Sequence, residues 1–183
     1  MQLLNGRPQN CEDRLLKEIK CYDFLDKLNI NYLRVDHNEA DNMEICSEIE
    51  KVLGAKICKN LFLCNRQETQ FYLLMMPANK PFKTKDLSKQ IESSRLSFAS
   101  SENMEKYLNI TPGSVSVLGL MNDRKGCVKL LVDDDLLKQE YIGVHPSINT
   151  SSLKIKTEDV FETIVRELNH PMTVVSLPDI SNE

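Results

Sequence analysis

Two apolar runs near the middle of the chain restrict its fold more than any other feature. The runs Ile57–Cys64 and Phe71–Met76 are joined by the polar stretch Asn65–Gln70. Apolar runs of strand length around a short polar connection are typical of a β-hairpin. Both faces of both runs are apolar, so the two strands have to be covered on both sides. We therefore expect them in the middle of a sheet that packs against helices.

The rest of the chain mixes helical and extended patterns in an irregular order. Apolar residues at helical spacing predict helices over Glu12–Leu28, Asp41–Leu53, Thr84–Ile91, Ser101–Leu108 and Thr157–Leu168, and one helical turn over Asp134–Gln139. Extended segments are predicted over Asn31–His37, Leu96–Ala99, Ser114–Leu120, Cys127–Asp133, Tyr141–Val144, Ser152–Ile155 and Thr173–Ser176. Residues 1–10 are expected to form a loose tail. This order favours an α/β fold of the α+β type, with a mixed sheet wrapped by helices, over a doubly wound parallel sheet.

Length and composition bound the class of protein. The 183 residues suit one domain, and 41% hydrophobic with 27% charged residues is typical of globular proteins. A net charge of −4 argues against broad nucleic-acid coating and membrane adhesion, but it allows a local basic patch. No apolar run approaches the roughly 20 residues that span a bilayer, and no signal core precedes the first helix. We expect a cytoplasmic protein without a membrane partner.

The six cysteines form no CxxC pair and fit no zinc-ligand spacing. They are expected to be reduced thiols that act as small buried hydrophobes. No metal and no cofactor is implied.

A charged and an amide side chain interrupt the first apolar run. In a regular strand Lys59 and Asn60 point to opposite faces, and Lys59 shares its face with Ile57 and Leu61. An ammonium group on a covered face is unfavourable unless it is paired or opens into a cavity. Two interpretations follow: Lys59 is the polar centre of a cavity, or it lies near the start of the strand and extends to water. Asn60 is likewise either a binding group or a satisfied structural amide.

Two histidines stand at the ends of predicted strands. His145 follows the strand Tyr141–Val144, and Pro146 biases it toward an extended conformation, which presents the imidazole at the strand end. His37 ends the strand Asn31–His37. Both are candidate binding groups, and both are equally compatible with a structural or merely exposed histidine.

Small residues flank the predicted strand Ser114–Leu120. Gly113, Ser114 and Gly119 would permit close approach of the backbone to a ligand, although glycines are also ordinary turn residues. The sequence has no GxSxG elbow, no phosphate-binding glycine loop and no HExxH motif. The residue pattern therefore predicts a lysine-centred pocket and does not itself choose a reaction.

Four segments, in order along the chain, resemble the YbaK superfamily of prolyl-tRNA synthetase-associated domains, in its freestanding PrdX or ProX branch. They are Asp36-His37 before a helix, Gly54–Leu63 with its Lys-Asn-Leu-Phe-Leu run, Thr111–Val115 with Gly119–Asp123, and Gly143–Pro146 with Asn149-Thr150. The resemblance covers residues 12–177, the core of one domain over 1–183. It implies a compact mixed sheet, partly barrel-like, surrounded by helices.

The resemblance also implies an activity. These domains hydrolyse the ester of a mischarged aminoacyl-tRNA, and the ProX branch removes alanine from proline tRNA while the YbaK branch removes cysteine. It implies catalytic roles for Lys59, Asn60 and His145, which would orient the ester for attack by water. Substrate contacts are implied for His37, Gly113, Ser114, Gly119 and Pro146. The implied partners are the acceptor end of aminoacyl-tRNA and prolyl-tRNA synthetase.

One position departs from the family pattern. Many relatives carry Thr or Ser about six residues after the early histidine, where this chain has Asn42-Met43-Glu44. Met43 would narrow the pocket and favour a small cargo such as alanine, or it is a core residue of its helix. A non-catalytic adaptor that binds aminoacyl-tRNA or a synthetase, and a cysteine-based redox protein, remain as alternatives.

A cluster of lysines after the predicted hairpin, and basic residues on or beside two later turns, could contact tRNA phosphates, although solvated surface residues would give the same pattern. The candidates are Lys80, Lys83, Lys85, Lys89, Arg124, Lys125, Lys154 and Lys156.

Overall fold

The computed structural model describes residues 1–39 and 43–179, and the side chain of Met43 lies outside that description. Nine strands form one mixed sheet in the order β1-β2-β8-β7-β3-β4-β6-β9, and β5 pairs with β3 off this path. The strands are β1 (Leu3–Asn5), β2 (Tyr32–Asp36), β3 (Lys56–Asn65), β4 (Phe71–Pro77), β5 (Leu96–Phe98), β6 (Val128–Asp133), β7 (Tyr141–Val144), β8 (Ser151–Lys156) and β9 (Met172–Val175). The predicted mixed sheet with helices around it is confirmed.

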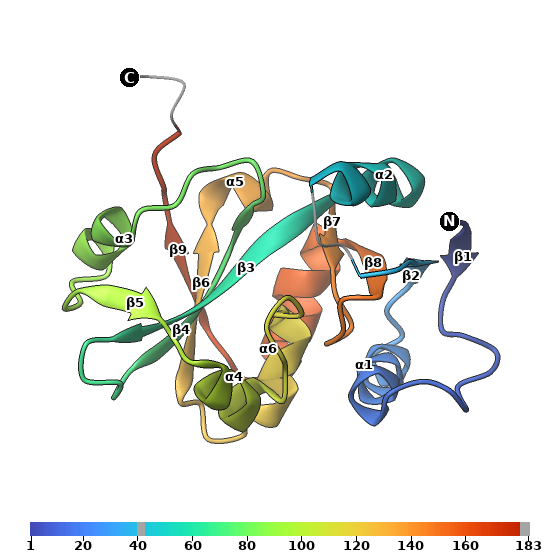
Figure 1. The fold of residues 1–183 in the computed structure, drawn as a ribbon, viewed down its shortest axis with the longest axis horizontal. Helices are drawn as coiled ribbons and strands as arrows, with labels where there is room; N and C mark the ends of the chain where they lie inside the picture. Colours follow the sequence, from blue (N-terminus) through green and yellow to red (C-terminus); the bar gives the residue numbers. More distant parts are fainter. Residues whose placement is uncertain (40–42, 180–183) are drawn as a thin grey trace.

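The long strand β3 crosses the middle of the molecule, and helices lie on several sides of it (Figure 1). They are α1 (Leu16–Lys27), α2 (Met43–Leu53), α3 (Thr84–Gln90), α4 (Ser101–Leu108), the 3₁₀ helix η1 (Val117–Asn122), α5 (Asp134–Leu137), the π-helix η2 (Asp159–Ile164) and α6 (Val165–Glu167). α2 lies beside the start of β3, and α3 lies toward the opposite side of the molecule (Figure 1).

The predicted hairpin is present and central. β3 and β4 pair antiparallel from Cys58 opposite Pro77 to Cys64 opposite Phe71. Further out, β7 pairs parallel with the start of β3, and β6 pairs parallel with β4. Both strands therefore have neighbours on both sides, as their two apolar faces require.

The two faces of β3 enter different parts of the core. Cys58, Phe62 and Cys64 belong to the main cluster, which η2 and α6 complete. Leu63, on the other face, belongs to a second cluster with residues of β4, α3 and β9. Strand alternation thus assigns Lys59 and Asn60 to opposite faces, as predicted.

Two local predictions were wrong. Leu3–Asn5 is a strand and not a loose tail, because it pairs antiparallel with β2. The segment Ser114–Leu120 is no strand: the Ser116 side chain accepts a hydrogen bond from the Leu118 amide and starts η1 instead. The predicted last helix is present, although most of its length, η2, is π-helical.

Candidate active site

A cavity of about 280 Å³ lies where β3 begins, between β3, α2, the loop before η1 and the loop after β7. Its lining residues come from all four elements: Cys46, Ile57, Cys58, Lys59, Asn60, Gly113, Val115, His145 and Asn149.

The strand pairing explains why a cavity forms here. β7 pairs with β3 only at Lys56 and Ile57, and β5 pairs with β3 only from Leu63 to Asn65. Among the described strands, the stretch from Cys58 to Leu61 thus has β4 as its one strand neighbour. The open edge of β3 makes residues of both its faces accessible from one cavity, and this accounts for Lys59 and Asn60 lining it together.

Gly143 brings the loop after β7 close to β3. A Cβ atom at this position would lie 2.9 Å from the Ile57 Cα atom, closer than side chains tolerate. Only glycine allows this approach. It places His145, two residues further on, at the same cavity as Lys59.

Lys59 is half-buried, and its Nζ donates one hydrogen bond, 3.2 Å long, to the backbone carbonyl of Lys80. An ammonium group has three protons to donate. No other hydrogen bond or ion pair of the Lys59 ammonium group is found among residues 1–39 and 43–179. The group therefore keeps donors for a ligand with oxygen acceptors.

Asn60 and Cys58 contact one another at the floor of the cavity. The Asn60 amide donates to the Cys58 carbonyl at 3.3 Å, and the Cys58 thiol donates to the Gly143 carbonyl at 3.2 Å. Burial raises the pKa of the Cys58 thiol to about 12, and burial also raises the pKa of Cys46. Both thiols of the cavity therefore stay protonated near neutral pH, which argues against a thiolate nucleophile.

The hydrogen bonds of His145 define its tautomer. Its Nδ1 lies 3.0 Å from the Ser151 carbonyl oxygen, which can only accept, so Nδ1 carries the proton and Nε2 is an acceptor. Burial lowers the pKa of His145 below its usual value. The imidazole is therefore neutral at physiological pH.

His37 is joined to His145 through the Ser152 hydroxyl. The Ser152 Oγ lies 2.9 Å from His37 Nε2 and 3.5 Å from His145 Nδ1. His37 Nδ1 lies 2.7 Å from the Asn38 carbonyl oxygen, so it too carries its proton on Nδ1. Ser152 must then donate to His37. Burial lowers the pKa of His37, although the charge of Asp36 acts in the opposite direction.

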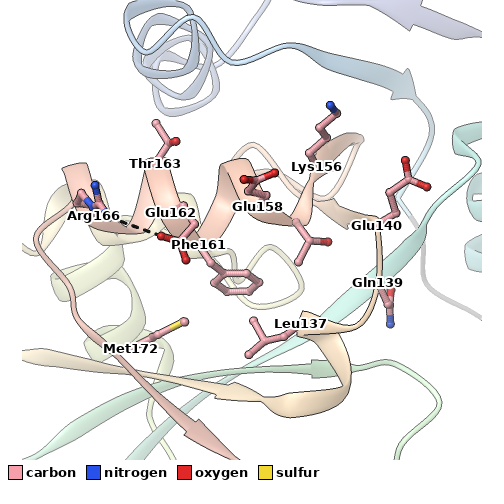
Figure 2. Close-up of a pocket in the computed structure, with 11 residues that line it drawn as sticks. Leu137, Gln139, Glu140, Lys156, Glu158, Phe161, Glu162, Thr163, Arg166 and Met172 are labelled. Carbon is pink, nitrogen blue, oxygen red and sulfur yellow. Dashed lines mark ion pairs between the residues drawn. The ribbon is translucent and has the colours of Figure 1, made fainter.

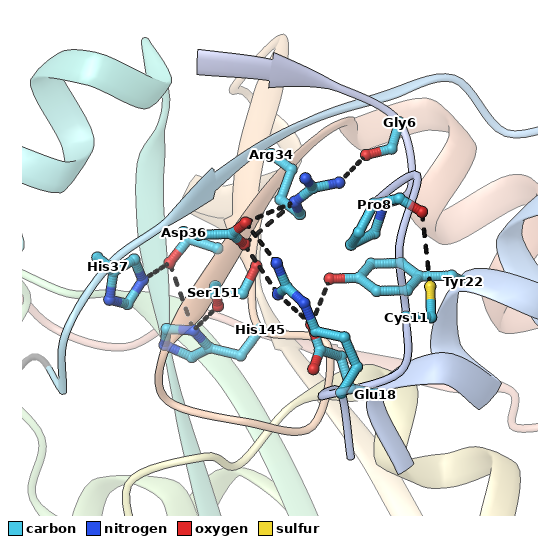
Figure 3. A network of polar contacts seen from close by, with 12 residues as sticks. Gly6, Pro8, Cys11, Glu18, Tyr22, Arg34, Asp36, His37, His145 and Ser151 are labelled. Atoms are coloured by element: carbon cyan, nitrogen blue, oxygen red, sulfur yellow. Dashed lines mark hydrogen bonds and ion pairs between the residues drawn. The ribbon is translucent and has the colours of Figure 1, made fainter. Parts of the chain in front are cut away.

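A charged network anchors this side of the sheet (Figure 3). Arg14 contacts Asp36 at 2.7 Å and Glu18 at 2.8 Å, and Arg34 contacts Asp36 at 3.1 Å. Burial would raise the pKa of Asp36, but the two guanidinium groups lower it. Tyr22 donates a 2.7 Å hydrogen bond to Glu18. The network fixes α1 to β2, next to the histidine pair.

Lys80 was one of the candidates for a phosphate contact or a solvated surface lysine, and its surroundings fit neither interpretation. Its side chain is only 5% exposed, and its Nζ lies 2.9 Å from Asp133 and 2.7 Å from Asp135. Burial would lower the pKa of Lys80, but the hydrogen bonds and charges of the two aspartates raise it. The ammonium group of Lys80 therefore compensates two aspartates of the protein and is not available for a phosphate.

The structure brings four of the predicted site residues together at the cavity: Lys59, Asn60, Gly113 and His145. Gly113 adopts a φ of +85°, which favours glycine. His37, Ser114, Gly119 and Pro146 do not line the cavity. A Cβ atom on Gly119 would lie 2.4 Å from the Ile110 side chain, so this glycine serves packing. The Met43 side chain lies outside the described residues.

Sequence reasoning gave no role to Cys46, Val115 or Asn149, which also line the cavity. Asn149 belongs to a segment that carried the family resemblance, and that was a signal for it. Cys46 lies on an ordinary amphipathic helix, and nothing in its local pattern marks it.

A larger hollow of about 930 Å³ lies on another part of the molecule, along η2 (Figure 2). Phe161 and Leu137 point into it, and charges of both signs surround them, with Arg166 and Glu162 paired at 3.5 Å. None of the predicted catalytic or substrate-binding residues lines it, although Lys156, a candidate phosphate contact, does. Size therefore does not identify the site here.

A sequence model described as the aminoacyl-tRNA editing domain matches residues 37–163, a span that contains every lining residue of the smaller cavity. The chain belongs to this family. The prolyl-tRNA editing protein ProX of Acetoanaerobium sticklandii is 33% identical to this editing domain over 153 residues, 84% of this chain and 93% of that protein. The YbaK/ProX resemblance is thereby confirmed.

Two further likenesses agree with the assignment to the editing-domain family. The prolyl-tRNA synthetase associated domain-containing protein 1 of Danio rerio is 26% identical over 164 residues, 88% of this chain and 87% of that protein. A crystal structure described as a candidate trans-editing enzyme for prolyl tRNA synthetase has a TM-score of 0.68 at 12% identity, and covers 90% of this chain and 98% of that one. At this identity the solved structure shows the fold alone. Among the described residues, no helix is long and apolar enough to cross a membrane.

Proposed function

We propose that this editing domain is a trans-acting aminoacyl-tRNA deacylase that removes alanine from mischarged proline tRNA. The observation that carries the proposal is the meeting of Lys59, Asn60 and His145 at one cavity, inside the segment that matches the editing-domain family. The name of the ProX relative adds support for proline tRNA.

The chemistry of an aminoacyl ester suits these side chains. The ester is already activated, so water can attack its carbonyl without a covalent enzyme intermediate. The protein then has to orient the ester and stabilise the negative charge that develops on the carbonyl oxygen. Lys59 supplies a cation with unused donors for that oxygen or for the terminal nucleotide, and Asn60 supplies an amide for the substrate.

His145 is suited to accept a proton or a hydrogen bond. Its Nδ1 proton is directed to the Ser151 carbonyl, which leaves the Nε2 lone pair for the attacking water or for a hydroxyl of the terminal adenosine. Because His145 is neutral at physiological pH, it can accept a proton without first releasing one.

The size of the cavity favours a small cargo. A cavity volume of about 280 Å³ is at the lower limit of ligand pockets, which measure roughly 300–1,000 Å³. Alanine and cysteine differ by a single sulfur atom, and a pocket of this kind separates such pairs by only about 1–3 kcal/mol. We therefore propose alanine as the preferred cargo, with cysteine as a slower one.

A deacylation assay on Ala-tRNA(Pro), Cys-tRNA(Pro) and Pro-tRNA(Pro) tests the proposal, with prolyl-tRNA synthetase absent so that any hydrolysis is in trans. We expect alanine release to be fastest and proline release to equal spontaneous hydrolysis. Faster release of cysteine would reassign the cargo. Tight binding of all three without any acceleration would instead indicate an adaptor.

A further inference from the structure

A second, basic pocket lies beside the candidate active site. It has a volume of about 280 Å³ and is lined by Lys17, Lys20, Asn109, Met121, Asn122 and Arg124. Lys17 and Lys20 come from α1, and Arg124 comes from the turn after η1. Three cations thus meet in one pocket of a protein whose net charge is −4.

None of these three cations forms an ion pair with another residue in the described ranges 1–39 and 43–179. The acidic residues next to them in sequence are directed inward. Glu18 is buried, where it binds Arg14 and Tyr22. Like charges that converge without internal partners repel one another, and an anion bound between them would relieve that repulsion.

The carboxylate of Asp123, the sequence neighbour of Arg124, is likewise buried and bonded inside the protein. Its carboxylate accepts hydrogen bonds from the backbone amides of Cys127 and Val128 at 3.0 and 2.7 Å, and it lies 3.1 Å from His170 Nε2. The turn is further held by the Asn122 amide, which donates to the carbonyls of Leu108 and Gly119. Arg124 therefore extends from a hydrogen-bonded turn, and the adjacent carboxylate of Asp123 does not pair with it because it binds other groups of the protein.

The basic pocket and the active-site cavity have no lining residue in common, but two parts of the structure connect them. In α1, the Cys21 thiol contacts the Lys17 carbonyl at 3.3 Å on one side and the Ser147 hydroxyl at 3.3 Å on the other. Ser147 belongs to the loop that carries His145. Similarly, the segment from Gly113 to Arg124 lines the active-site cavity at its start and the basic pocket at its end.

We propose that the basic pocket binds backbone phosphates of the tRNA acceptor end while the aminoacyl ester occupies the cavity at Lys59. The three cations and the neutral amide of Asn109 line the same pocket, and together they offer donors for phosphodiester oxygens. Contacts of this kind position a nucleic acid without reading its sequence. The inference rests on the proposed function for the identity of the RNA. It assigns Lys17 and Lys20 a role that neither the sequence pattern nor the family resemblance indicated.

The test is binding of uncharged tRNA(Pro), measured by fluorescence anisotropy, because it does not require hydrolysis. The variant is Lys17→Glu/Lys20→Glu/Arg124→Glu. Its charge-matched control is Arg66→Glu/Arg95→Glu/Lys129→Glu, whose positions lie at the far end of β3. We expect the first triple to weaken binding at least ~10-fold. The slope of the logarithm of the binding constant against the logarithm of the salt concentration should become shallower by about 0.7–0.9 per lost phosphate contact. The control should change binding less than ~2-fold.

Equal weakening by the two triples would show that net charge alone matters and would overturn the inference, as would no weakening by either. If the reversal variant is unfolded by circular dichroism, the glutamine triple at the same three positions replaces it, with the same expected direction. A wild-type protein that binds tRNA through this pocket but deacylates nothing would refute the proposed function and leave the inference standing. If the wild-type protein deacylates and the first triple variant has the same KM as wild type, only the inference is refuted.

Discussion

Two lysines that touch one another have opposite surroundings in this protein. Lys80 is 5% exposed, and its ammonium group lies between Asp133 and Asp135. Lys59 is half-buried, and its ammonium group contacts only the backbone carbonyl of Lys80 among the described residues. The first charge is satisfied by the protein, whereas the second keeps donors that face a cavity.

The difference shows that partners, more than burial, distinguish a structural charge from a functional one. A buried cation with two carboxylates needs no ligand, and removing it leaves uncompensated negative charge. A cation at a cavity with one neutral acceptor contributes little to folding and is available for a substrate. Replacing each lysine in turn should therefore affect different properties of the protein.

The largest expected effect on stability is that of Lys80→Met. The change leaves Asp133, which is fully buried, without its cation, and breaking a buried pair in this way costs about 3–5 kcal/mol of the free energy of unfolding. Lys59→Met is the matched control, because it removes one hydrogen bond to a carbonyl, and it should cost less than about 1.5 kcal/mol. Urea unfolding of both variants measures this, and equal losses would show that Lys59 too is a structural charge.

A smaller effect is expected for Ser152→Ala, which removes the hydroxyl between His37 and His145. The Ser151 carbonyl still holds His145 Nδ1, so we expect deacylation to fall roughly 3- to 10-fold, the equivalent of one hydrogen bond. The acid limb of the pH–rate profile should move at the same time, because the variant alters the surroundings of His145. A lower rate with an unchanged profile would show that Ser152 acts only through packing.

The smallest effect is a pH dependence of the stability that Lys80 provides. Hydrogen bonds from Lys138 and Lys80 lower the pKa of Asp135 to about 2. A carboxyl group whose folded pKa is depressed contributes stability above its unfolded pKa of roughly 4, and this contribution disappears as the pH falls through the folded value. The difference in unfolding free energy between wild type and Lys80→Met should thus be largest near pH 8 and shrink on acidification toward pH 2, because each proton that binds to the aspartates removes a charge that Lys80 compensates. A difference that stays constant from pH 8 to about 2 would contradict this assignment of charges.

Local pattern predicted those parts of the fold that local physics determines. The central hairpin follows from two apolar runs and their polar connection, and the predicted helix Ser101–Leu108 is α4, where the Ser100 side chain caps the start by accepting from the Asn103 amide. β1 could not be predicted, because three residues form a strand only through pairing with β2. η1 was missed because its start depends on Ser116 and on the packing of Gly119 against Ile110.

The candidate site shows the same limit. Lys59 stood out in the sequence as a charge within an apolar run, but Lys80 lies in an ordinary lysine-rich stretch, and only the fold brings the two aspartates to it. The link from His37 through Ser152 to His145 likewise joins strands β2 and β8 across the sheet. Such contacts depend on register between segments that are distant in sequence, and no local pattern encodes them.

Single-turnover hydrolysis of Ala-tRNA(Pro), with enzyme in excess, tests most directly whether Lys59 orients the ester. Wild type should release alanine well above the spontaneous rate, and Lys59→Ala should reduce the rate constant about 100-fold, as expected for the loss of one charge-stabilising donor. The neighbouring exposed lysine on the same strand supplies the control, Lys56→Ala, which should retain the wild-type rate. Lys59→Ala with the wild-type rate constant would contradict the account.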